Sequence, residues 1–206
     1  MEITNCKVYD LEESIVASGL PMIAEYDETE CGKAVRELFL CHLTGDIQDN
    51  PHFKRAVKLA DTPQGSGHSN FLSGIVVSMN VTATVKWWEQ FQRYHFKQIV
   101  SSMSTMHRLR KMAVDGTIQF NPLTSPDMVK AFIRLAKDKS VTDEELAYAC
   151  PMGLMLTARV TTNYLQLRTQ YRQRKNHKLR EWRDYCGWIE SLPFADEFIT
   201  GNTENE

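Results

Sequence analysis

The sequence predicts an α+β fold that is rich in helix. Three observations predict it: several segments repeat apolar residues at helical spacing, two shorter runs are rich in β-branched residues, and no internal repeat is present. The 206 residues, 42% hydrophobic and 24% charged, match the globular average and suffice for one sizeable core. We therefore expect a single domain over residues 1–200 and a disordered, acidic tail over 201–206.

Two amphipathic helices are predicted in the first third of the chain, over 29–43 and 52–61. Apolar residues recur there at helical spacing, so that one face of each helix is apolar. These residues include Ala34, Val35, Leu38 and Phe39 in the first helix and Phe53, Ala56, Val57 and Ala60 in the second.

A strand and a further helix follow a cluster of residues that break regular structure. The proline and glycines within 61–67 predict a turn. The run 71–84 is rich in valine and threonine and predicts a strand. From 85 to 95 the apolar spacing becomes helical again, which suits a helix packed against that strand.

Start signals place two more helices in the second half of the chain. Ser125-Pro126 offers a polar N-cap and a first-turn proline for a helix over 126–138. Thr142-x-x-Glu145 matches a capping box and opens a helix over 143–149. The stretch 101–112 is compatible with more than one assignment.

The C-terminal part combines a strand with a long helical segment. Pro151 ends the preceding helix, and residues 154–161 can form a strand. Residues 163–190 have a strongly helical pattern, broken at most once. The fold predicted from these elements is rich in helix, with few strands.

The charge total excludes one broad class of partner and hides a local asymmetry. Twenty-four Lys and Arg against 26 Asp and Glu give a formal net charge of −2, which excludes a broadly cationic nucleic-acid coat. Residues 168–183 nevertheless hold seven cations and one acid, a net +6, and leave −8 for the rest of the chain. The basic run is either an anion-binding helix or a charged solvent face.

Cysteine and histidine usage, and the absence of targeting signals, predict a cytoplasmic protein outside the membrane. Five cysteines with no C-x-x-C pair indicate free thiols in a reducing compartment. Residues 1–10 lack the basic and apolar regions of a signal peptide, and no window is apolar enough to cross a bilayer. The six histidines lack the pair spacing of metal ligands, so we expect no metal site.

Two segments carry polar side chains that suit a phosphorylated, planar ligand. The turn from Gly65 to Phe71 presents His68 and Asn70, and its glycines let backbone N–H groups approach a phosphate. Gln90, Arg93 and Tyr94 fall on one face of the predicted helix, where an amide, a guanidinium and a phenol suit a heterocycle bearing phosphate. Taken singly, the two segments are better explained by a plain turn and by a solvated polar face.

A third candidate is Arg168, the first residue of the basic run. It directly follows the apolar Tyr164-Leu165-x-Leu167, so we expect it to be buried or to face a pocket. The cations from Lys175 onward are expected to face solvent.

In their order and spacing, these segments resemble the flavin-dependent thymidylate synthases. Gly67-His68-x-x-Phe71 is similar to the family's G-H-x-x-[PF] turn, and Gln90-x-x-Arg93 to its Q-x-x-R-H-R helix. The segment from Asn163 to Arg168 is similar to the family's N-[FY]-[LI]-x-L-R block. Ala147-x-x-Cys150-Pro151 stands where the family has a helix ending in R-x-x-L-P. The resemblance covers roughly residues 30 to 190 and implies the family's fold, in which helices pack around a small, mostly antiparallel sheet.

The resemblance implies an enzyme that transfers a methyl or hydroxymethyl group to C5 of a pyrimidine deoxynucleotide such as dUMP. It implies FAD as cofactor, with methylenetetrahydrofolate and NADPH as cosubstrates and reduced flavin as the hydride source. It also implies a homotetramer with active sites at subunit interfaces.

The same resemblance assigns roles to residues of this chain. It implies cofactor binding by His68, Asn70, Arg93, His95, Asn163 and Leu167. It implies nucleotide binding by Gln90, Arg93, Arg108 and Arg168. Arg168 is the implied catalytic residue, because a guanidinium beside the pyrimidine stabilises negative charge that develops on N1 and O2.

The sequence departs from the family pattern after Arg93, where the Asn-Glu pair of the signature is missing. Arg108 stands in for the arginine that closes that signature, and Ala147 or a neighbour replaces an arginine. These departures favour an altered substrate or reaction. They also keep open a catalytically silent nucleotide- or flavin-binding oligomer and, third, nucleic-acid binding by the basic helix, which predicts DNA affinity that falls steeply with salt.

Overall fold

The computed structural model describes residues 1–63 and 65–201, so most of the predicted tail, 202–206, lies outside the described residues. The chain forms two compact units. Unit 1 comprises residues 1–5 and 79–160, and unit 2 comprises residues 6–78 and 161 onward. Whether residues 1–200 form a single domain stays a prediction.

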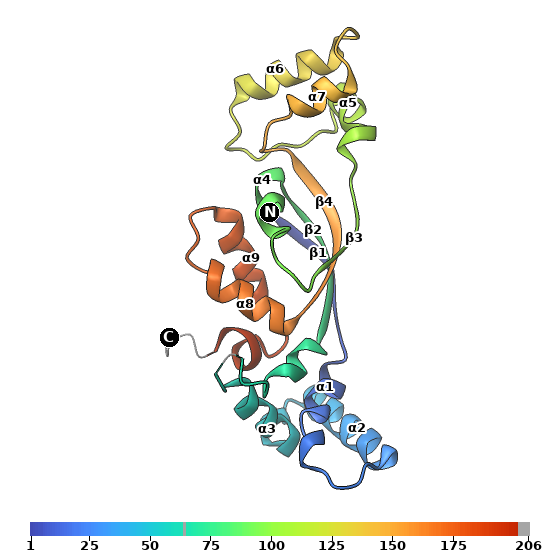
Figure 1. Cartoon of the computed structure of the whole chain (residues 1–206), viewed down its shortest axis with the longest axis vertical. Helices are drawn as coiled ribbons and strands as arrows, with labels where there is room; N and C mark the ends of the chain where they lie inside the picture. The colour runs from blue at the N-terminus through green and yellow to red at the C-terminus, as the bar shows by residue number, and fades with distance from the viewer. Residues whose placement is uncertain (64, 202–206) are drawn as a thin grey trace. The chain divides into compact units, whose positions relative to one another are not determined.

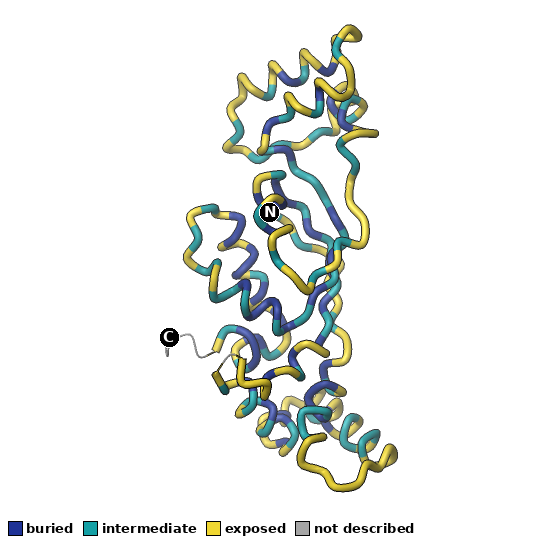
Figure 2. Tube along the Cα trace, viewed as in Figure 1, coloured by how far each residue is buried: buried dark blue, intermediate teal, exposed yellow. Residues whose placement is uncertain are grey.

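A four-stranded antiparallel sheet, with the order β1-β2-β4-β3, is the β component of the fold (Figure 1). Its strands are β1 (Glu2–Tyr9), β2 (Val76–Thr84), β3 (Gln98–Ser102) and β4 (Met155–Asn163). In β2 every second residue is buried, from Val77 to Ala83, as the alternating colours along this strand show (Figure 2). This alternation is what a half-buried strand requires. The predicted α+β class, with helices around a small antiparallel sheet, is confirmed.

The helices of unit 2 pack into one connected set. Helix α1 contacts both α2 and α3, and α8 contacts α9 and the short helices η3 and η4. Contacts of α1 with η3 and of α3 with η4 connect these helices. The helices are α1 (Leu11–Ala17), η1 (Leu20–Met22), α2 (Glu28–Thr44), η2 (Ile47–Asp49), α3 (Pro51–Ala60), η3 (Asn70–Ser73), α8 (Tyr164–Arg174), α9 (Arg180–Glu190) and η4 (Asp196–Thr200).

Unit 1 contains a helical cluster in which α5, α6 and α7 contact one another, visible together in Figure 1. The helices of unit 1 are α4 (Val85–Phe91), α5 (Thr105–Asp115), α6 (Pro126–Lys137) and α7 (Asp143–Tyr148). The apolar core of the cluster includes Leu109, Phe132, Leu146 and Leu154, each at most 3% exposed. The predicted capping box of Thr142 and Glu145 is present and begins α7.

Arg110 of α5 connects this helix to α6, to α7 and to the loop between them through four hydrogen bonds. Its Nε donates to Asp143 Oδ1 at 2.6 Å, and its Nη2 donates to the Val141 carbonyl at 2.6 Å. Its Nη1 donates to the carbonyls of Ala136, at 2.8 Å, and Asp138, at 3.1 Å. The guanidinium thus satisfies carbonyls at the C-terminus of α6, where a positive charge also complements the helix dipole.

Most predicted elements are confirmed, and two boundaries were wrong. The helices over 29–43, 52–61, 126–138 and 143–149, the strand over 154–161 and a single break within 163–190 are confirmed to within one or two residues. The strand over 71–84 starts only at Val76, because Phe71 and Leu72 turn in η3 instead. Leu72 is fully buried and the Phe71 ring packs on Phe198 at 5.8 Å, so tertiary packing overrides strand propensity here.

The second wrong boundary is the helix over 85–95, which ends at Phe91. Its buried side chains are Trp87, Trp88 and Phe91, and the backbone then turns away from the helix. As a correction, Arg93 and Tyr94 therefore do not share a helical face with Gln90 but lie in the turn that follows it.

All five cysteines are free thiols, and burial divides them by reactivity. Burial raises the pKa of Cys150 to about 11 and that of Cys186 to about 12, whereas Cys6 is exposed on β1. Because the thiolate is the nucleophile, we expect iodoacetamide at pH 8 to modify Cys6 well before Cys150 and Cys186. Peptide mass spectrometry over a time course measures the order, and equal rates at the three positions would contradict it.

In the part of the chain that the structure describes, no helix combines the length and hydrophobicity needed to cross a membrane.

Candidate functional site

The turn that carries His68 and Asn70 belongs to unit 2 and is open. Gly65 and Gly67 adopt φ values of +90° and +83°, a region that favours glycine, and a Cβ at either position would have no atom within 4 Å. His68 and Asn70 are exposed, while Ser69 between them is buried and anchors the turn. Backbone and side-chain donors of this turn are therefore accessible to a ligand.

The helix α8, which packs against η3, carries the other predicted residues of unit 2. Asn163 is its N-cap, since its Oδ1 accepts from the Gln166 amide at 2.9 Å. This leaves the Asn163 amide nitrogen as the group that can bind a ligand. Leu167 is fully buried in the single chain.

Arg168 is 5% exposed, which confirms the expectation of a buried or pocket-facing side chain. Among the described residues, only Arg168 and Glu181 are charged side chains classed as buried. Further along the basic run the cations become accessible, and the Arg180 side chain is 79% exposed. Because a buried guanidinium acts in a lower dielectric than one in water, Arg168 is the cation of this run suited to stabilise charge on a ligand.

In unit 1, three of the predicted residues lie at the end of α4 or beyond it. Gln90 is half-buried on α4, and Arg93 and His95 are exposed beyond the helix. The turn forms because the Arg93 amide donates to the Gln90 carbonyl at 3.3 Å and the Tyr94 amide to the Phe91 carbonyl at 3.1 Å. Gln90 at the end of α4 and Arg93 and His95 beyond it thus lie close together in the sequence.

Buried aromatic residues of α4 support the start of this turn. Phe91 is fully buried and stacks on Trp87 with ring centroids 4.5 Å apart. Trp88 lies edge-on to Phe91 and donates its indole N–H to the Leu156 carbonyl at 3.0 Å. This packing holds the C-terminus of α4, and with it the start of the turn, in a defined place.

Arg108 lies on α5 of unit 1 and is exposed. It stands two positions from Arg110, whose guanidinium is fully engaged in the helical cluster. The two arginines therefore have different roles: Arg110 is structural, and Arg108 has its charge available to solvent or a ligand.

The chemistry of the predicted residues fits FAD and dUMP. The set offers guanidinium, imidazole and amide groups and contains no acid. Such groups donate hydrogen bonds to phosphate oxygens and to the carbonyl edges of flavin and pyrimidine rings. Among residues 1–63 and 65–201, no group of three or more His, Cys, Asp or Glu is placed to hold a metal ion.

One cavity in unit 2 was not predicted: it has a volume of about 550 Å³ and is lined by α1, η1, α2 and α3 and the loop before α2. Its wall includes Arg55, which donates to the carbonyls of Ile15 and Val16 at 3.3 and 3.1 Å. The Arg55 guanidinium thereby satisfies the C-terminus of α1, a structural role. Residues about 40 positions apart meet here, so no local spacing could have predicted it.

Solved structures share this fold. ThyX, the flavin-dependent thymidylate synthase of Helicobacter pylori, in complex with FAD and dUMP, has a TM-score of 0.66 at 14% identity, with 97% of each chain covered. A second structure of the same enzyme with FAD and dUMP has a TM-score of 0.63 at 16% identity and the same coverage. The UMP/dUMP methylase PolB of Streptomyces cacaoi, bound to 5-Br dUMP, has a TM-score of 0.56 at 13% identity, with 97% of this chain and 95% of that chain covered.

No protein-family model matches the sequence, and no curated protein sequence matches it either. At 13–16% identity the structural likeness establishes the fold. The chain therefore has the ThyX fold, as the resemblance in its motifs implied.

Proposed function

We propose that the protein is a divergent flavin-dependent enzyme that transfers a methyl or hydroxymethyl group to C5 of a pyrimidine deoxynucleotide such as dUMP. The observation that carries the proposal is the coincidence of the ThyX fold over 97% of the chain with the motif residues in their expected order. Fold alone does not define activity, so the residues must support the chemistry.

FAD would supply the hydride that the transfer needs. In unit 2 we assign its binding to the open turn with His68 and Asn70, and to Asn163 and Leu167 at the start of α8. In unit 1, Arg93 and His95 offer accessible cationic and imidazole donors for its phosphates.

Arg168 would carry the catalytic role on the nucleotide. Its burial keeps water away from most of the guanidinium, so its interaction with a developing negative charge is stronger than in solvent. Placed against N1 and O2 of the pyrimidine, it would stabilise the charge that builds up there when C5 becomes nucleophilic. Gln90 and Arg108 would orient the base and phosphate of the same nucleotide.

The remaining parts of the proposal concern cosubstrates and assembly. Methylenetetrahydrofolate would donate the carbon, and NADPH would reduce the flavin. We propose a homotetramer with active sites at subunit interfaces, supported by the exposed Phe39, Leu40 and Leu43 on α2, which are 48%, 60% and 67% exposed in the single chain. Five free thiols support a reducing, cytoplasmic location.

A second candidate is a catalytically silent flavin- or nucleotide-binding oligomer on the same scaffold. It is favoured by two features of the sequence, the missing Asn-Glu pair after Arg93 and the loss of the family's arginine at Ala147 or a neighbouring position. This candidate binds the same ligands and releases no product.

The purified protein is expected to bind FAD and dUMP and, with reductant and methylenetetrahydrofolate, to form a nucleotide modified at C5. Flavin absorbance after gel filtration measures FAD uptake, and mass spectrometry of the nucleotide pool detects the added carbon. A protein that takes up no FAD contradicts the proposed function, whereas one that binds both ligands without product supports the silent oligomer.

A further inference from the structure

Phe96 has an unusual backbone for its residue type. Four non-glycine residues among those described have positive φ: Asn5, Asp10, Phe96 and Phe194. Asn and Asp tolerate this left-handed region, and Asp10 uses it as the N-cap of α1. For a bulky aromatic residue the same conformation is a true outlier, and such outliers persist only when their surroundings enforce them.

Packing within the chain offsets this conformation at Phe194 but not at Phe96. The Phe194 ring lies 4.8 Å from His42, 5.0 Å from Phe53 and 6.3 Å from Phe198, measured between centroids. Phe96, at a φ of +54°, is 82% exposed and makes no ring contact with residues 1–63 or 65–201. The chain therefore holds an aromatic ring in solvent at a conformational cost.

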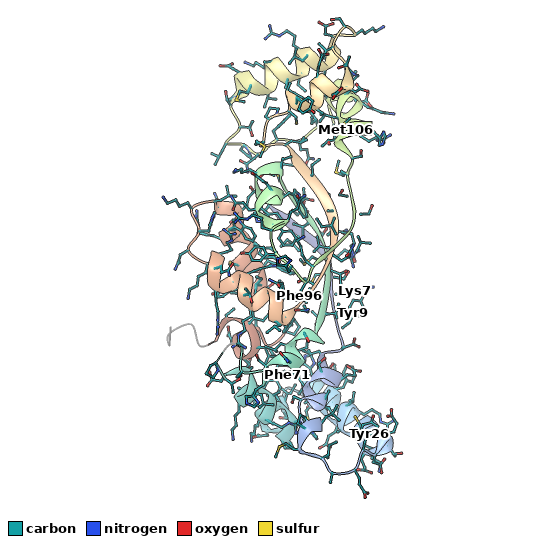
Figure 3. The ribbon with its side chains drawn as sticks, in the orientation of Figure 1. Lys7, Tyr9, Tyr26, Phe71, Phe96 and Met106 are labelled. Carbon is teal, nitrogen blue, oxygen red and sulfur yellow. The ribbon has the colours of Figure 1, made fainter. Side chains whose placement is uncertain are left out.

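The residues on both sides of Phe96 explain how the conformation is enforced. Before it, the turn is closed by the Tyr94 amide on the Phe91 carbonyl. After it, Lys97 places its Nζ 5.4 Å from the centroid of the buried Phe91 ring. With both flanks anchored on Phe91, the intervening residue is directed outward, and Figure 3 labels Phe96 on this loop between α4 and β3.

The neighbours of Phe96 indicate what its ring contacts. It follows His95 directly and Arg93 by three positions, and both of these side chains are exposed donors for anions. An aromatic face beside such donors is the combination that recognises a planar heterocycle bearing phosphate, because ring stacking adds to charge-assisted hydrogen bonds.

We propose that Phe96 stacks on the planar ring of a phosphorylated heterocycle, either FAD or the pyrimidine nucleotide. The inference rests on the proposed function and adds a binding residue that the motif resemblance does not contain. The cost of the left-handed backbone is then offset in the complex, where the ring gains its partner.

The test replaces Phe96 with asparagine, which tolerates positive φ but cannot stack as a phenyl ring does. We expect Phe96→Asn to melt at or above the wild-type temperature and to bind one of the two ligands about 5- to 100-fold more weakly. Phe96→Tyr keeps the ring and should bind as the wild type does. Separate titrations with FAD, by flavin fluorescence, and with dUMP, by calorimetry, identify which ring is stacked.

Leu123→Asn is the matched control, because Leu123 is 90% exposed in another loop of the same unit and is assigned no ligand. Wild-type affinity of Phe96→Asn for both ligands overturns the inference. If the sedimentation coefficient of this variant changes while both affinities stay at the wild-type value, the inference is also overturned, because the ring then covers a second copy of the chain. If the wild-type protein binds neither FAD nor dUMP, the proposed function fails together with the inference.

Discussion

We expect Arg168→Lys to weaken dUMP binding or turnover by about 100-fold or more while the protein stays folded. The Arg168 guanidinium is 5% exposed, so its charge acts with little screening by water. Lysine keeps the charge but replaces the planar, delocalised guanidinium by a compact ammonium, so the positive charge is no longer spread along the N1–O2 edge of the pyrimidine. Calorimetric dUMP binding and steady-state turnover measure the loss.

Arg180→Lys is the matched control for this experiment. Arg180 belongs to the same basic run, but its side chain is 79% exposed and its partner is Asp184 at 3.6 Å. The same chemical change should leave both binding and turnover unaltered there. Far-ultraviolet circular dichroism of the two variants checks the fold, because a buried arginine also contributes to packing. Unchanged dUMP affinity and turnover in folded Arg168→Lys would refute the assignment of Arg168.

The elements that could be predicted depend on interactions between residues that are close together in the sequence. Helix α7 could be predicted because Thr142 and Glu145 satisfy the first amide groups of the helix from within its own first turn. Strand β2 could be predicted because its alternation reflects one buried face. Arg168 could be predicted as buried because three apolar residues precede it in the helix that it shares with them.

The missed features depend on contacts between distant residues. Strand β1 has almost no buried residue, so its sequence shows no alternation that would identify it. Helix α4 stops at Phe91 because its buried aromatic residues end there. Arg93 therefore does not lie on the helical face on which it was predicted. The exposed, left-handed Phe96 carries no signal at all, since backbone conformation in a turn depends on what anchors its two flanks.

A second large effect is expected from Arg110→Ala, which should destabilise the helical cluster of α5, α6 and α7. The substitution leaves the carbonyls of Ala136, Asp138 and Val141 and the carboxylate of Asp143 without the four hydrogen bonds that Arg110 donates. Water can replace some of these bonds because the Arg110 side chain is 29% exposed. We therefore expect a loss of about 2–3 kcal/mol in the free energy of unfolding.

Arg108→Ala separates this structural role from ligand binding, because Arg108 lies on the same helix but is exposed. It should unfold within about 0.5 kcal/mol of the wild type and bind dUMP more weakly. Arg110→Ala should do the reverse under conditions where it is folded: lower stability with dUMP affinity retained. Urea denaturation measures the free energy of unfolding of both variants, and calorimetry measures their affinity for dUMP. Wild-type stability of Arg110→Ala would show that Arg110 does not hold the cluster, and undiminished affinity in Arg108→Ala would remove Arg108 from the nucleotide site.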